Sequence, residues 1–331
     1  MTRALVLGGG GVTGIAWEIG VLTGLRDAGI DVHGWELVVG TSAGSIVGAK
    51  VLGHPDLDGL FAAQARASTM DDDLPIQTLG GRVAANLLRL GRRRGLGWTP
   101  RLWVAAFAIE TLVRRHAGRG RIRRPNAPPL RGLRTIAPPD PALARIGTFG
   151  LAARTASETT FREVIRATLD PVTEWPEALV VTAIDVLTGA TVAIDARSGV
   201  PFVDGIAASC SVPGLMPAVT LGGRRYMDGG MASQTHADVA REHDDVLVIA
   251  PIDLGLLHGE TERLRAQGSR VTTVTPGPEA TLAIGRNIGL LDPARRARSA
   301  AAGREDGLRA AETVGRTVPR PASPRLAESA S

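Results

Sequence analysis

The first 52 residues divide into short apolar runs and longer segments with helical spacing. A continuous apolar run over 3–7 ends at Gly8 and predicts a short buried strand. Apolar residues recur at helical spacing over 15–28, which predicts a helix that ends near Gly29. The pattern then repeats, with a strand predicted over 35–39 and a helix over 45–52. Such an order predicts parallel strands joined by crossover helices.

The remainder of the chain is regular only in its second half. Glycine, proline and arginine interrupt the pattern between 71 and 150, where only two short helical pieces are predicted, over 82–90 and 100–115, and where 124–141 is predicted to be irregular. Beyond this region the pattern predicts one helix and several strands, two of them paired as a hairpin around Leu187-Thr188-Gly189. The helix is expected over 159–169 and the strands over 179–184, 191–195, 225–227, 246–250 and 271–274.

The composition is that of a globular protein. The 331 residues are 44% apolar and 21% charged, and no apolar stretch approaches the ~20 residues of a membrane span. The single cysteine, Cys210, allows neither an intrachain disulfide nor a zinc site built from cysteines. We therefore expect a cytoplasmic protein.

Gly40-Thr41-Ser42-Ala43-Gly44 lies between the second predicted strand and the second predicted helix. The Gly-x-Ser-x-Gly pattern at such a junction is typical of a nucleophile elbow, in which the serine lies on a sharp, strained turn. Gly40 and Gly44 let the turn close without a Cβ clash, and the following helix points its amides at developing negative charge. Ser42 is a candidate nucleophile, and a purely structural turn is the alternative.

Gly9-Gly10-Gly11-Val12-Thr13-Gly14 also follows a strand and opens a helix. As a dinucleotide fingerprint it would require an acid at the end of the second strand, and residues 38–42 contain none. As an oxyanion hole, its glycine amides would stabilise a tetrahedral intermediate formed on Ser42. A glycine-rich turn without a ligand is the third interpretation.

A serine nucleophile requires a base. None of the six histidines lies in a local pattern that marks it as catalytic, although His236 can be proposed for a Ser-His-Asp triad. Asp228 follows the strand predicted at 225–227 and precedes Gly229 and Gly230. Its carboxylate is therefore expected at the end of a sheet, where the sites of α/β proteins gather. An aspartate that merely opens a turn is the structural alternative.

The three motifs together, in this order, resemble the patatin-like phospholipase family. The resemblance rests on residues 9–14 and 40–44, on Asp228-Gly229-Gly230, and on Ser211-Val212-Pro213-Gly214-Leu215-Met216-Pro217 upstream of the aspartate. It covers about 1–55 and 158–300 and implies an α/β fold, namely a three-layer α/β/α sandwich with a central, mostly parallel sheet. The basic segment that it does not cover is expected to be an insert between the two halves. The hydrolase domain would span 1–318 with an Arg-rich insert or lid at 71–150, and a disordered tail would follow at 319–331.

The resemblance also implies hydrolysis of lipid carboxylic esters by a Ser–Asp dyad, of the phospholipase A, lysophospholipase or esterase type. Ser42 would form the acyl intermediate, Asp228 would act as the base, and the amides of Gly9, Gly10 and Gly11 would form the oxyanion hole. The glycines that shape these turns are Gly14, Gly40, Gly44, Gly229 and Gly230. No cofactor and no metal are expected. The alternatives are a catalytically degenerate lipid-binding or regulatory protein, a Ser-His-Asp α/β-hydrolase and a nucleotide-binding oxidoreductase.

One residue departs from the pattern of the family, since Thr13 stands where its glycine loop usually carries arginine or lysine. Backbone amides can still stabilise an oxyanion, but any electrostatic help from a cationic side chain at this position is absent.

The net charge of +5 is unevenly distributed, because 82–134 contains 14 arginines and one acid, Glu110. Trp98, Trp103 and Phe107 lie among these arginines, which favours peripheral contact with an anionic lipid surface. No nucleic-acid-binding motif accompanies the charge, so we expect a lipid or acyl-ester partner and no nucleic acid. A solvated, Arg-rich loop is the alternative. Salt-sensitive co-sedimentation with anionic but not zwitterionic vesicles distinguishes the two.

Overall fold

The computed structural model describes residues 1–54, 56–66, 130, 132–153 and 155–317. The chain forms two compact units, unit 1 from Met1–Ala67 with Gln234–Ser331 and unit 2 from Ser68–Ser233. The helical pieces predicted at 82–90 and 100–115, nearly all of the basic segment 82–134, and the tail predicted at 319–331 lie outside the described residues.

Unit 1 is built on a parallel sheet. Its strands follow the order β2-β1-β8-β9, with Leu7 of β1 opposite Gly40 of β2 on one side and Ile249 of β8 on the other. The strands are β1 (Arg3–Leu7), β2 (Leu37–Gly40), β8 (Asp245–Ile249) and β9 (Arg270–Val274). The β1–α1–β2 crossover predicted from the first 52 residues is confirmed.

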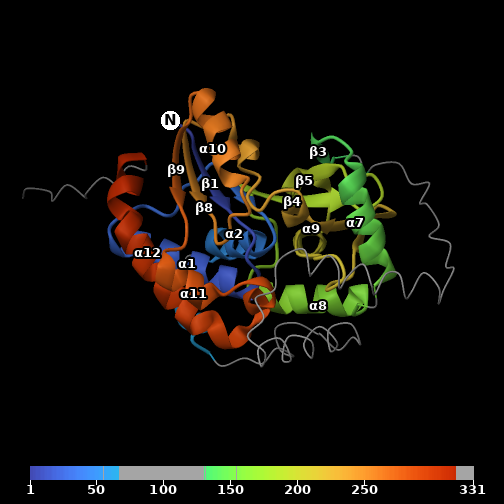
Figure 1. The fold of residues 1–331 in the computed structure, drawn as a ribbon, viewed down its shortest axis with the longest axis horizontal. Helices are drawn as coiled ribbons and strands as arrows, with labels where there is room; N and C mark the ends of the chain where they lie inside the picture. Colours follow the sequence, from blue (N-terminus) through green and yellow to red (C-terminus); the bar gives the residue numbers. More distant parts are fainter. Residues whose placement is uncertain (55, 67–129, 131, 154, 318–331) are drawn as a thin grey trace, which may run out of the picture. The chain divides into compact units, whose positions relative to one another are not determined.

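Helices cover both faces of this sheet, because successive side chains of each buried strand point to opposite sides. Ala4 and Val6 of β1 pack with Leu257 and Leu264 of α10 on one face. Helix α12 contacts β8 and β9, and it packs along α1 (Figure 1). The helices of unit 1 are α1 (Gly11–Asp27), α2 (Ala43–Gly53), α3 (Leu57–Gln64), α10 (Leu257–Ala266), α11 (Pro278–Ile284) and α12 (Arg296–Thr317), with short 3₁₀ turns η3 (Ala237–Ala240), η4 (Asn287–Leu291) and η5 (Pro293–Arg295).

Unit 2 contains antiparallel strands in the order β3-β5-β4-β7-β6. The strands are β3 (Arg134–Ala137), β4 (Leu179–Asp185), β5 (Thr191–Asp195), β6 (Val219–Leu221) and β7 (Arg224–Asp228), and the helices are α7 (Pro141–Ala152), α8 (Glu158–Leu169) and α9 (Phe202–Ser209). Helix α9 packs on β4, β6 and β7, and α8 packs on α9. Leu143 and Leu151 of α7 pack against a separate cluster that contains Ile184 and Met227.

The predicted α/β class, with strands flanked by helices, is confirmed. The hairpin of β4 and β5 is also confirmed, as is α8, whose buried Phe161, Ile165 and Leu169 recur every four residues. The prediction that 124–141 is irregular is wrong at β3, a short strand with exposed residues that pairs with β5. Among the described residues no helix combines the length and the apolarity needed to cross a bilayer.

Candidate active site

Ser42 lies on a strained turn between β2 and α2. Its backbone has φ 52° and ψ −115°, a positive-φ conformation that non-glycine residues rarely adopt. Ser42 is half-buried, whereas every other residue from Val38 to Ala49 is buried. It is also the residue that precedes the first turn of α2, where the positive end of the helix dipole favours negative charge. Ser42 therefore lies on a sharp, strained turn between a strand and a helix, at the junction expected from the sequence.

Two glycines allow this turn because backbone lies where their side chains would be. A Cβ on Gly44 would collide with the Leu7 carbonyl oxygen, and a Cβ on Gly40 would lie 2.7 Å from the Gly44 carbonyl oxygen. The Gly44 amide donates to the carbonyls of Gly8 at 3.0 Å and Thr41 at 2.9 Å. The elbow is thus bonded directly to the end of β1.

The glycine loop between β1 and α1 lies beside Ser42. A Cβ on Gly9 would lie 3.6 Å from the Ser42 Cβ, which is an ordinary contact distance and shows how near the loop lies to the serine. Gly10 and Gly11 are the first residues of the turn that starts α1, where amides have no acceptor within the helix. Gly11 has φ 62°, and a Cβ on it would lie 2.7 Å from the Leu290 carbonyl oxygen.

The three predicted oxyanion amides differ in what they bind. The Gly9 amide donates to the carbonyl oxygen of Gln234 at 2.8 Å, which commits it to the protein's own backbone. The loop that carries Gln234 is fixed by buried Glu260, whose carboxylate accepts hydrogen bonds from the Thr235 hydroxyl at 2.5 Å and the Ala237 amide at 3.1 Å. Of the three amides predicted to form an oxyanion hole, that of Gly9 is therefore already bonded within the fold.

Thr13 has a structural role at the position where the family usually carries a cationic residue. Its side chain is fully buried, and the hydroxyl lies 3.1 Å from the Ile284 carbonyl oxygen and 3.3 Å from that of Leu290. Thr13 therefore holds α1 against the chain around η4, and its side chain carries no charge.

Glu18 is an ionisable group beneath the glycine loop that the sequence did not single out. It lies on α1 with no exposed surface, and neither carboxyl oxygen makes a well-formed hydrogen bond to the described residues. Burial raises the pKa of Glu18 well above its usual value, and the nearby Gly8 backbone offsets this only in part.

Asp228 is the last residue of β7 in unit 2, and its side chain is 2% exposed. Its Oδ1 accepts a hydrogen bond from the Gly230 amide at 2.7 Å, which fixes the orientation of the carboxylate. Its own amide donates to the Ser211 carbonyl at 3.0 Å. Gly229 is required here because a Cβ would lie 2.8 Å from the Thr182 carbonyl oxygen of β4.

The histidine proposed for a triad, His236, lies in unit 1. It is 8% exposed and has φ 50°, and it directly precedes η3. It follows Gln234 by two residues, so it belongs to the loop that binds the Gly9 amide.

The family model of the patatin-like phospholipases matches residues 5–241. The chain belongs to the patatin-like phospholipase family. The matched region contains the glycine loop, the Ser42 elbow and Asp228, and it ends before β8. The patatin-like sheet nevertheless continues past the match, because β8 pairs with β1 over five residues.

Two other comparisons add little to the family match. No curated protein matches this chain. Among solved structures, the crystal structure of VipD from Legionella pneumophila is similar, with 12% identity, a TM-score of 0.40, and coverage of 94% of this chain and 67% of that chain.

Proposed function

We propose that this patatin-like protein is a serine hydrolase of lipid carboxylic esters, with Ser42 as the nucleophile and Asp228 as the base. The observation that carries the proposal is the strained, positive-φ and half-buried Ser42 beside a glycine loop, in a chain that belongs to a family of phospholipases. Strain of this kind at a serine is typical of a nucleophile held at the start of a helix.

In the proposed reaction, the Ser42 Oγ attacks the ester carbonyl carbon while Asp228 takes the hydroxyl proton. The carbonyl oxygen becomes an oxyanion that accepts hydrogen bonds from the Gly10 and Gly11 amides. Collapse of this intermediate breaks the ester bond, and the leaving alkoxide receives the proton from Asp228. Water then attacks the acyl-Ser42, Asp228 takes its proton, and the fatty acid leaves as Ser42 recovers its hydrogen.

The amides that bind the oxyanion must supply much of the lowering of the activation barrier, because an aspartate is a weak base for a serine hydroxyl. Removing one oxyanion donor in comparable hydrolases costs roughly 3–4 kcal/mol. The positive ends of α1 and α2 add to the same effect, since both helices begin at the elbow and the glycine loop.

The test compares wild type with Ser42→Ala in hydrolysis of short-chain and phospholipid esters. The substitution is expected to abolish turnover without unfolding the protein. It should also abolish covalent labelling by a fluorophosphonate, with mass spectrometry locating the label on Ser42 in wild type. The matched control is Ser198→Ala, which removes another serine hydroxyl, bonded to the Asp195 carbonyl at 2.6 Å, and should keep activity. Persistent labelling of Ser42→Ala would assign the nucleophile to another residue.

A further inference from the structure

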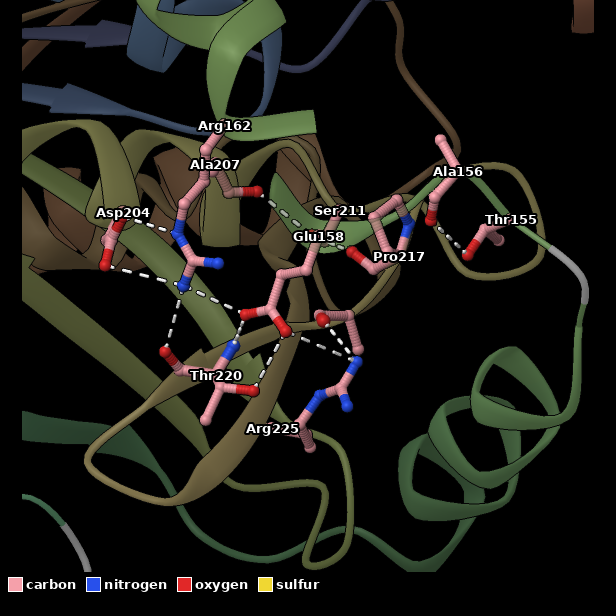
Figure 2. Close-up of polar contacts among 11 residues, drawn as sticks. Thr155, Ala156, Glu158, Arg162, Asp204, Ala207, Ser211, Pro217, Thr220 and Arg225 are labelled. Carbon is pink, nitrogen blue, oxygen red and sulfur yellow. Dashed lines mark hydrogen bonds and ion pairs between the residues drawn. The ribbon is translucent and has the colours of Figure 1, made fainter. Parts of the chain in front are cut away.

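Ser211 contacts both ends of the β6–β7 hairpin that carries Asp228. Its buried hydroxyl lies 2.7 Å from the carbonyl oxygen of Pro217, two residues before β6, and 3.0 Å from that of Ala207 in α9 (Figure 2). Its carbonyl oxygen accepts the amide of Asp228, where β7 ends, at 3.0 Å. One residue therefore holds the start and the end of the hairpin against α9.

The strands of the same hairpin are fixed by a network of ion pairs (Figure 2). Glu158 of α8 accepts hydrogen bonds from the amide and the hydroxyl of Thr220 in β6. Arg162 bonds Glu158 at 2.9 Å and Asp204 of α9 at 2.7 Å, and it donates to the Thr220 carbonyl at 3.3 Å. This network holds β6 on the helices. At the other end of the hairpin, Asp228 lies opposite Ala183 of β4, and the Ser211 carbonyl accepts its amide.

The hydroxyl of Ser211 carries one proton, and two carbonyl oxygens face it. The Ala207 carbonyl also receives the Cys210 amide at 3.2 Å, so it retains a donor when the hydroxyl is removed. Pro217 is buried, and an unpaired buried carbonyl is costly. Loss of the hydroxyl therefore favours a shift of the chain at Pro217, and such a shift is transmitted to Asp228 through the short strands β6 and β7.

We propose that Ser211 is a positioning residue that sets the location of the Asp228 carboxylate. The inference rests on the proposed function, in which Asp228 takes the proton of Ser42. Ser211 acts on the reaction through Asp228 and not through substrate. A misplacement of about 1 Å in a catalytic group can lower turnover by about 100-fold. Ser211→Ala is therefore expected to lower kcat by at least about tenfold while KM stays within twofold of wild type.

The experiment measures kcat and KM of the full chain with a short-chain ester, and kcat is calculated from the concentration of active sites that a fluorophosphonate titrates. Titration removes unfolded molecules from the comparison, and thermal unfolding is recorded for each variant. Ser198→Ala is the matched control, because Ser198 is also a buried serine of unit 2 whose hydroxyl bonds a backbone carbonyl. It is expected to lose comparable stability and to keep kcat within twofold.

Asp228→Asn separates the two proposals. An Asp228→Asn protein that hydrolyses esters at the wild-type rate overturns the dyad, and the role of Ser211 with it. When Asp228→Asn is inactive, the dyad stands. A Ser211→Ala kcat within twofold of wild type, or an equal loss of kcat in Ser198→Ala, then overturns the positioning role alone.

Discussion

Helices α1 and α12 of unit 1 touch backbone to backbone through two glycines on each helix. These glycines are Gly20, Gly24, Gly303 and Gly307. A Cβ on Gly20 would lie 2.9 Å from the Arg304 nitrogen and 3.0 Å from the Ala300 carbonyl carbon, and it would collide with the Ala300 carbonyl oxygen. Ordinary contacts of a Cβ begin at 3.4 Å, so Gly20→Ala must push the two helices apart.

The expected loss of stability follows from three contributions. Replacing glycine by alanine inside a helix gains about 0.5–1 kcal/mol. Forcing a methyl group into a packed interface costs about 1–3 kcal/mol. The helices also share a buried hydrogen bond, from Trp17 Nε1 to Asp306 Oδ2 at 2.8 Å, and stretching it adds to the cost. The net effect is a loss of about 2 kcal/mol, or a fall in Tm of roughly 3 °C for a chain of this length.

Thermal and urea unfolding of the full chain measure this loss. Gly259→Ala in α10 is the control, because the nearest atom to its Cβ would be the Arg263 Nη1 at 3.6 Å. The control should leave stability unchanged or raise it by up to about 1 kcal/mol. The two variants thus have opposite expected signs. A Gly20→Ala protein as stable as wild type would refute the backbone contact between α1 and α12.

Two further predictions concern the ionisable groups. Burial raises the pKa of Glu18 in the folded protein above its value in the unfolded chain. The free energy of unfolding is therefore unaffected below the unfolded-state pKa and falls as the pH rises from there toward the folded-state pKa, by up to about 1.4 kcal/mol per pH unit. In profiles of Tm against pH, the Tm of Glu18→Gln should therefore rise relative to that of wild type as the pH increases. Parallel profiles would contradict this. Asp228→Asn should lower kcat by several orders of magnitude while His236→Ala keeps most activity, and the reverse order would favour a Ser-His-Asp triad.

The elements that the sequence predicted well bury large apolar side chains at regular spacing. Both β1 and β5 were predicted with their observed bounds, because each is a short apolar run or alternation beside a glycine. Helix α12 was not predicted, since its buried face consists of small or polar residues such as Ser299, Ala300 and Gly303. Such a face lets two helix backbones approach closely, and a search for apolar residues at helical spacing does not detect it.

The same distinction applies to the candidate site. Ser42 and Asp228 could be nominated from the sequence because the chemistry proposed for them depends on the side chain, and because the glycines beside them are required by nearby backbone. Ser211 was noticed only as part of the motif 211–217, and the sequence assigned no role to its hydroxyl. Gln234 could not be nominated in this way, since the bond it makes to Gly9 uses a main-chain carbonyl, which every residue has. For the same reason the sequence treated Gly9, Gly10 and Gly11 as equivalent donors. Only the fold separates them, because it directs the Gly9 amide to the Gln234 carbonyl and places Gly10 and Gly11 at the start of α1.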